Sequence, residues 1–111
     1  MRVIVKEPNK PCEIRKVKDS LDTYQEIVGG LIESVIIQGL SEHGIICYCN
    51  EEGKFKDFDI NFLLTWENEI YDIIVGPVVF LRDDGEGGNK SLTDKDIKLI
   101  KDYLTTPRLV Q

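Results

Sequence analysis

The sequence has very few of the side chains on which small enzymes depend. It contains a single histidine, His43, so a Ser-His or Cys-His catalytic pair would have to use that residue. His43 lies in a short segment between glycines, without the G-x-S-x-G pattern of a nucleophile elbow. We therefore predict that the protein has no catalytic residue and is not an enzyme.

Cysteine is also scarce, and its spacing fits neither a disulfide framework nor a metal site. Cys12, Cys47 and Cys49 are an odd number, which favours free thiols in a reducing compartment. Structural zinc sites use four nitrogen or sulfur ligands, commonly with two to four residues between paired cysteines. Cys47 and Cys49 are two apart on an expected strand, so both side chains share one face and are predicted to pack in the core. We predict no metal and no other cofactor.

Long apolar runs and an excess of cations are missing too. No run approaches the roughly 18–20 residues that span a bilayer, and the first seven residues are too short and too charged for a signal peptide. We therefore expect a cytoplasmic protein without membrane contact. Lys and Arg number 14 against 20 Asp and Glu, a net charge of −6, which argues against binding to duplex nucleic acid. Five of the fourteen cations lie within 6–18, where we interpret them as polar faces of strands.

The patterns that are present predict one α+β domain over 1–106 and a C-terminal tail at 107–111. Strands are expected at 2–6, 12–17, 31–37 and 45–49, with a short return strand at 55–58. The strongest strand signal covers 71–81 and is interrupted by Gly76 and Pro77.

Two helices complete the expected domain. The first is predicted to begin after a Ser20 N-cap and to end at Gly29 and Gly30. The second follows a Thr93 N-cap with Asp96 as its capping-box partner. The order is β-β-α-β-β-(β)-β-α, a small and mostly antiparallel sheet of about five strands with both helices on one side.

A turn at 50–54 (Asn-Glu-Glu-Gly-Lys) supplies the candidate ligand site. We expect Gly53 to adopt a positive φ there. Polar residues lie close together around this turn, and one more approaches it if the last strand pairs alongside; the set is Asn50, Glu52, Lys54, Asn61 and Asp72. These side chains could line a small polar site, but Asx-turn and strand-end hydrogen bonds would explain them equally.

The segment 59–68 fits an irregular helical turn or a packed loop. The aromatic residues in and around it are Phe58, Phe62, Trp66 and Tyr71. They are predicted to be either a core cluster or, where exposed, an interaction patch. The edges of so small a sheet also need covering, and pairing with a second copy is one solution, so a homo-oligomer is possible.

Two sequence blocks support a family resemblance. Val28-Gly29-Gly30-x-Ile32-Glu33 and the block at 50–54, in this order and spacing, resemble the uncharacterised family named domain of unknown function 3846. The resemblance extends over 2–8, 24–33, 49–54, Asn61, 71–76 and 91–93, nearly the whole chain. Members of that family are small proteins of phages, prophages and conjugative elements. The resemblance therefore implies an accessory role for a mobile element, and it carries no established activity.

Three functional hypotheses follow. In the first, a non-enzymatic accessory protein binds a host target, sequestering a small nucleotide-like signal or engaging a host protein as an antagonist of host defence. In the second, the chain is a protein–protein interaction module of the element's own machinery, with an exposed aromatic patch near Trp66 and no deep polar pocket. In the third, a small metal-dependent hydrolase uses Glu52 and Asp72, whose carboxylates would have to converge.

Overall fold

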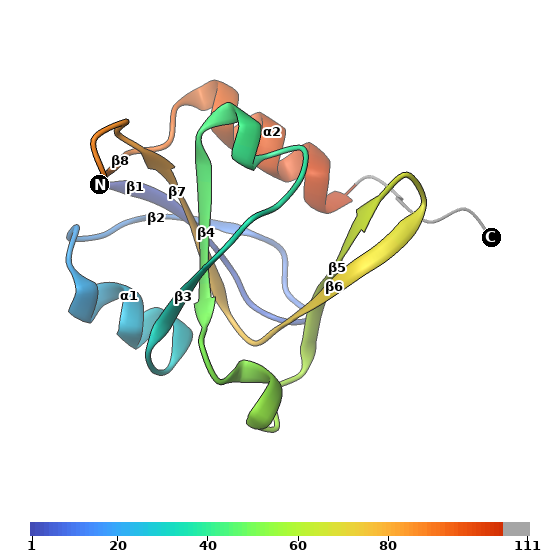
Figure 1. Cartoon of the computed structure of the whole chain (residues 1–111). Coiled ribbons are helices and arrows are strands. Elements are labelled where there is room, and N and C mark those ends of the chain that lie inside the picture. Colours follow the sequence, from blue (N-terminus) through green and yellow to red (C-terminus); the bar gives the residue numbers. More distant parts are fainter. Residues whose placement is uncertain (106–111) are drawn as a thin grey trace.

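The computed structural model describes residues 1–105, in which an antiparallel sheet has the strand order β2-β1-β7-β4-β3 (Figure 1). A separate hairpin, β5-β6, leaves the end of this sheet, and the short β8 pairs with β7. The strands are β1 (Arg2–Lys6), β2 (Glu13–Lys16), β3 (Ile32–Val35), β4 (Ile45–Asn50), β5 (Ile60–Trp66), β6 (Glu69–Val75), β7 (Val78–Asp83) and β8 (Asn89–Lys90). The helices are α1 (Leu21–Val28) and α2 (Asp94–Thr105), with 3₁₀ turns η1 (Ser41–His43) and η2 (Gly53–Phe55).

The α+β class and the order of the expected elements are confirmed. No helix within residues 1–105 is long and apolar enough to cross a membrane. The predicted tail, 107–111, lies outside the described residues.

The central strand β7 explains why the domain has three layers. Its first four residues, Val78 to Leu81, are fully buried, as expected for a strand covered on both faces. Val79 and Leu81 pack with β1 and with Tyr24 and Val28 of α1. The alternate residues, Val78 and Phe80, pack toward α2 and the hairpin.

The prediction that both helices lie on one side of the sheet is therefore wrong. In Figure 1, α1 and α2 lie on opposite sides of the sheet. The physical reason is that β1 and β7 are apolar on both faces, Val3 and Val5 facing α1 and Ile4 facing the other layer. A sheet with two apolar faces needs a cover on each.

Both helix starts follow the sequence signals. The Ser20 hydroxyl accepts a hydrogen bond from the Thr23 amide at 3.2 Å, and Gly29 ends α1 with φ 81°. At α2 the capping box is formed in both directions. The Asp96 amide donates to the Thr93 hydroxyl at 3.1 Å, and the Thr93 amide donates to the Asp96 carboxylate at 2.9 Å.

The Asp96 carboxylate also fixes α2 to the sheet. It accepts two hydrogen bonds from Arg82 of β7, at 2.7 and 2.6 Å, while Asp96 itself is almost completely buried. The same guanidinium donates to the His43 carbonyl of η1 at 2.9 Å. The hydrogen bonds from Arg82 hold the pKa of Asp96 well below its usual range. One ion pair thus joins α2, β7 and η1.

Several predicted boundaries need correction. Residues 55–58 do not form a strand, because η2 and the segment after it carry the chain from β4 to β5. The segment 59–68 is neither helical nor a loop, since β5 occupies most of it. The apolar segment 71–81 is not one strand: its first part belongs to β6 of the hairpin and its second part to β7 of the main sheet.

Replacing Asp96 with alanine should destabilise the protein by about 3 kcal/mol, because the substitution leaves the partly buried Arg82 without its carboxylate and removes a cap of α2. Since the pKa of Asp96 is depressed in the fold, this carboxylate stabilises the protein above its unfolded pKa of about 4 and less as the pH falls below that value. Urea unfolding at several pH values measures both effects.

The matched control is Asp102→Ala. Asp102 is also ion-paired on α2, with Lys98 at 2.8 Å, but both side chains are mostly exposed. Its loss should cost about 0.5 kcal/mol or less. Equal losses for the two variants would contradict the anchoring role of Asp96.

Candidate functional site

The hairpin is set apart from the main sheet by a sharp turn at Gly76, between β6 and β7. Gly76 has φ 73°, and a Cβ there would lie 2.7 Å from the Phe58 ring. Its amide donates to the Asp59 carbonyl at 2.9 Å. The following Pro77 has no amide hydrogen to offer a sheet partner. Glycine is therefore required at position 76 both by the backbone and by the approach of Phe58.

Asn61 binds one carbonyl of this turn and one carbonyl at the end of β1. Its side-chain amide donates to the carbonyls of Lys6 and Gly76, each at 2.8 Å. Its oxygen accepts from the Lys6 ammonium at 3.0 Å. Burial lowers the pKa of that ammonium. Asn61 therefore joins β1, β5 and the β6–β7 turn.

Asn50 has a comparable structural role at the end of β4. It is buried, its side-chain amide donates to the Val28 carbonyl at 3.2 Å, and its oxygen accepts from the Glu52 amide at 2.8 Å. This is the Asx-turn alternative that the sequence allowed. The positive φ expected at Gly53 is not observed. Glycine fits there because a Cβ would lie 3.0 Å from the Val75 side chain.

Lys54 and Asp72 are the two predicted ligand residues that pair directly. Lys54 of η2 forms an ion pair with Asp72 of β6. That hydrogen bond raises the pKa of Lys54. Partial burial opposes ionisation of Asp72, but the hydrogen bonds from Lys54 and the Ile73 amide outweigh it and lower its pKa. The pair fixes η2 against the hairpin, and each charge is already neutralised by the other.

A groove lies along this pair. It has a volume of about 540 Å³ and runs from η2 across the outer face of the hairpin. We call it the hairpin groove; its lining residues are Gly53, Lys54, Lys56, Phe58, Ile60, Ile70, Tyr71, Asp72, Ile73 and Val75. A smaller cavity of about 140 Å³ lies beside it and includes Asn50 and Cys49. Neither cavity is lined by Glu52 or Asn61.

Exposed apolar side chains are concentrated at the hairpin groove. Four of the ten exposed large hydrophobic residues line it, and a fifth, Phe55, lines the smaller cavity beside it. Phe55 is 91% exposed and Ile60 57%, and Ile70, Tyr71 and Ile73 are each between 38% and 48%. A contiguous apolar patch of this kind commonly marks an interaction surface.

The structure separates the four aromatic residues of the predicted patch. Phe62 is buried and stacks on Phe80 with 6.2 Å between ring centroids, so it belongs to the core. Phe58 packs on Gly76 and, like Tyr71, lines the hairpin groove. The Tyr71 hydroxyl accepts from the Gln38 amide at 3.1 Å. Trp66 is 49% exposed but lies in a different groove, between the hairpin turn and α2.

Residues 1–105 contain no cluster of three or more His, Cys, Asp or Glu side chains that could hold a metal ion. Cys47 and Cys49 are both buried, as their positions in β4 predicted. Burial raises the pKa of Cys49 to about 11 and that of Cys47 well above its ordinary value. These thiols are therefore protonated and poorly nucleophilic at neutral pH.

Sequence reasoning missed the isoleucines of the groove. The predicted strand at 71–81 includes Ile73 and places it in the main sheet, where alternate residues are buried, and Ile70 lies outside every predicted element. The missed signal was Glu67-Asn68, whose positive φ angles of 52° and 66° close the β5–β6 hairpin. A tight turn predicted at these two residues would have assigned 69–75 to a hairpin with the preceding segment.

Comparison with protein families now adds one firm assignment. The family model described as Domain of unknown function (DUF3846) matches residues 1–105. The chain belongs to this family. Among curated proteins and among solved structures, the comparisons found no match for this DUF3846 chain. Its function must therefore be argued from the groove itself.

Replacing Gly76 with alanine should cost about 2–4 kcal/mol, because the new Cβ adds a clash with Phe58 to the strain of a positive φ. The control is Gly85→Ala, which has φ 83° with nothing within 4 Å of the new Cβ. That control should cost only about 1 kcal/mol. Urea unfolding compares the two, and equal costs would show that the contact with Phe58 has no part in fixing the turn.

Proposed function

We propose that this DUF3846 chain is a non-enzymatic binding protein that contacts another polypeptide through the hairpin groove. The observation that carries the proposal is the concentration of exposed Ile60, Ile70, Tyr71 and Ile73 on one groove. Side chains of this size bury substantial apolar area when a partner covers them, which is the main source of affinity in protein interfaces. The interaction-module hypothesis predicts an exposed aromatic patch near Trp66 and no deep polar pocket. The mainly apolar lining of the hairpin groove supports an interaction module, although Trp66 itself lies in a different groove.

Sequestration of a nucleotide-like signal has weaker support. An anionic ligand needs available cations, and the hairpin groove offers Lys54 and Lys56. Lys54 is already paired with Asp72. The groove is also lined mainly by apolar side chains, which suit a polypeptide better than a phosphate.

The hydrolase hypothesis has less support still. Glu52 is exposed and does not line the groove, whereas Asp72 is bound to Lys54. The two carboxylates that this hypothesis requires therefore do not converge on one cavity.

The biological setting in this proposal comes from the family resemblance. We place the protein in the cytoplasm of a bacterial host as an accessory protein of a phage or other mobile element. The partner is then either a host protein, including a component of host defence, or a protein of the element itself. Both share the requirement for an exposed apolar contact surface.

The substitution Ile70→Ser should remove partner binding, because it places a hydroxyl where the proposed interface is apolar. Affinity purification from cells carrying the element, followed by quantitative mass spectrometry, measures which proteins co-purify with each form. We expect at least one protein that is enriched with the natural chain and reduced at least about tenfold with Ile70→Ser.

Ile14→Ser is the matched control. Ile14 is an isoleucine on strand β2 with 45% exposure, close to the 48% of Ile70, but it lies outside the hairpin groove. Circular dichroism checks that both variants fold. The proposal fails if no co-purifying protein distinguishes Ile70→Ser from Ile14→Ser.

A further inference from the structure

We infer that the occupant of the hairpin groove is a basic amphipathic segment of a partner protein, whose apolar face covers the groove and whose Lys and Arg side chains meet an acidic rim. This inference rests on the proposed polypeptide-binding function and specifies the chemistry of the partner. It follows from the distribution of charge around an apolar groove.

Most of the net negative charge lies in the segment that contains η2 and most of the hairpin. Residues 51–72 contain seven Asp and Glu and two Lys, a net charge of −5, out of −6 for the whole sequence. Six of these seven carboxylates are exposed, and Asp72 is half-buried. One of the two lysines, Lys54, is neutralised by Asp72. The other, Lys56, is exposed and lines the groove, so the six exposed carboxylates of this segment outnumber its one unpaired lysine. A partner that covers the groove therefore meets an excess of negative charge beside it.

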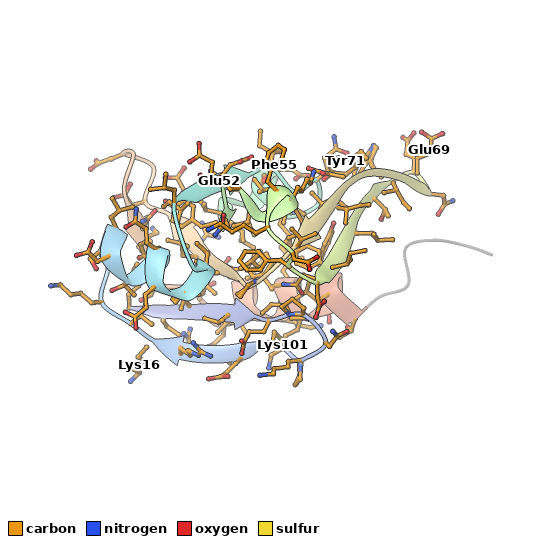
Figure 2. All side chains as sticks on the ribbon, turned by 90° about the horizontal axis from the view of Figure 1, so that it is seen from below. Lys16, Glu52, Phe55, Glu69, Tyr71 and Lys101 are labelled. Atoms are coloured by element: carbon orange, nitrogen blue, oxygen red, sulfur yellow. The ribbon has the colours of Figure 1, made fainter. Side chains whose placement is uncertain are left out.

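Figure 2 shows two of these carboxylates on the same margin of the molecule as two exposed aromatic side chains. Glu52, Phe55, Tyr71 and Glu69 follow one another along it, so the carboxylates flank the two exposed rings. Lys16 and Lys101 lie on the opposite margin. These two lysines therefore lie away from the groove, and the carboxylates of Glu52 and Glu69 on the groove side would attract a cationic partner.

The dimensions of the hairpin suit a single amphipathic helix. Each of its strands has seven residues, so the hairpin is about 23 Å long at about 3.3 Å per residue. A helix of about 15 residues has the same length. Helices that bind in apolar grooves present anchors three and four residues apart on one face, leaving the flanking positions for charged residues.

The test uses two synthetic peptides of about 15 residues with the same leucine pattern, one with lysine and one with glutamate at every polar position. Fluorescence anisotropy measures their binding to the full chain. The Leu/Lys peptide should bind at least about tenfold more tightly than the Leu/Glu peptide, and added salt should weaken its binding. Equal affinity for the two peptides, or no detectable binding of either, would overturn the inference.

Charge reversal at the rim separates this site from the net charge of the protein. The double variant Glu52→Lys, Glu69→Lys should weaken binding of the Leu/Lys peptide by about tenfold. The control, Glu26→Lys with Glu86→Lys, changes the net charge equally at exposed carboxylates away from the groove. It should leave the affinity within about twofold. Equal weakening by both double variants would contradict a localised site.

Two further readouts keep the inference distinct from the proposed function. If Ile70→Ser weakens binding while neither salt nor charge reversal has an effect, the groove binds apolar segments and only the basic chemistry of the partner is overturned.

Sedimentation of the protein alone tests whether a second copy of the chain occupies the groove. Residues 1–18 carry six cations and two carboxylates, so a second copy also offers positive charge. Self-association that the rim double variant abolishes would assign the groove to a second copy and overturn the inference.

Discussion

The left-handed turn at Gly76 is the constraint on which the rest of this structure depends. The chain from Tyr71 to Leu81 is mostly apolar, and its pattern predicts one long strand. Gly76 divides it, and the side chain of Asn61 fixes the division by binding the carbonyls of Gly76 and Lys6. After the turn, β7 enters the middle of the main sheet and is buried on both faces. Before the turn, β6 pairs only with β5. One side of this hairpin therefore covers the sheet, while the other side carries the groove.

This division leaves the protein with apolar surface that its own described residues do not cover. The inner face of the hairpin, with Phe62, Leu64 and Ile74, completes the core against α2 and β7. The outer face retains exposed isoleucines. A two-stranded hairpin is only marginally stable by itself, so it depends on packing of its apolar side chains against other groups. Leaving such side chains in water is unfavourable, so their retention on one groove is best explained by a partner that covers them. The surrounding carboxylates keep the exposed face charged and oppose contact between like surfaces.

Local signals in the sequence predicted the local elements well. Both helix starts, the glycine that ends α1, the buried cysteines and the α+β order follow from capping residues and alternation, which act over a few residues. The layer arrangement could not be predicted in the same way. The full burial of β7 depends on its neighbours β1 and β4, which are distant in sequence. The division of 71–81 at Gly76 depends on contacts with Phe58 and Asn61, which local patterns do not reveal.

The difference between local signals and contacts distant in sequence also explains how well the candidate site could be predicted. The sequence placed Asn50, Lys54, Asn61 and Asp72 near one turn, and Lys54 does meet Asp72. Asn50 and Asn61 are used internally, because buried backbone carbonyls near them needed donors. The predicted strand at 71–81 puts the groove residue Ile73 in the main sheet, and only the hairpin geometry exposes Ile73 and Ile70 on one groove. The central claim is that the outer face of the hairpin contacts another polypeptide in the cell. Photo-cross-linking from a benzophenone amino acid at position 70, compared with one at position 14, tests it directly. The account predicts a discrete cross-linked product from position 70 and none from position 14. Its absence at position 70, or equal products from both positions, would contradict it.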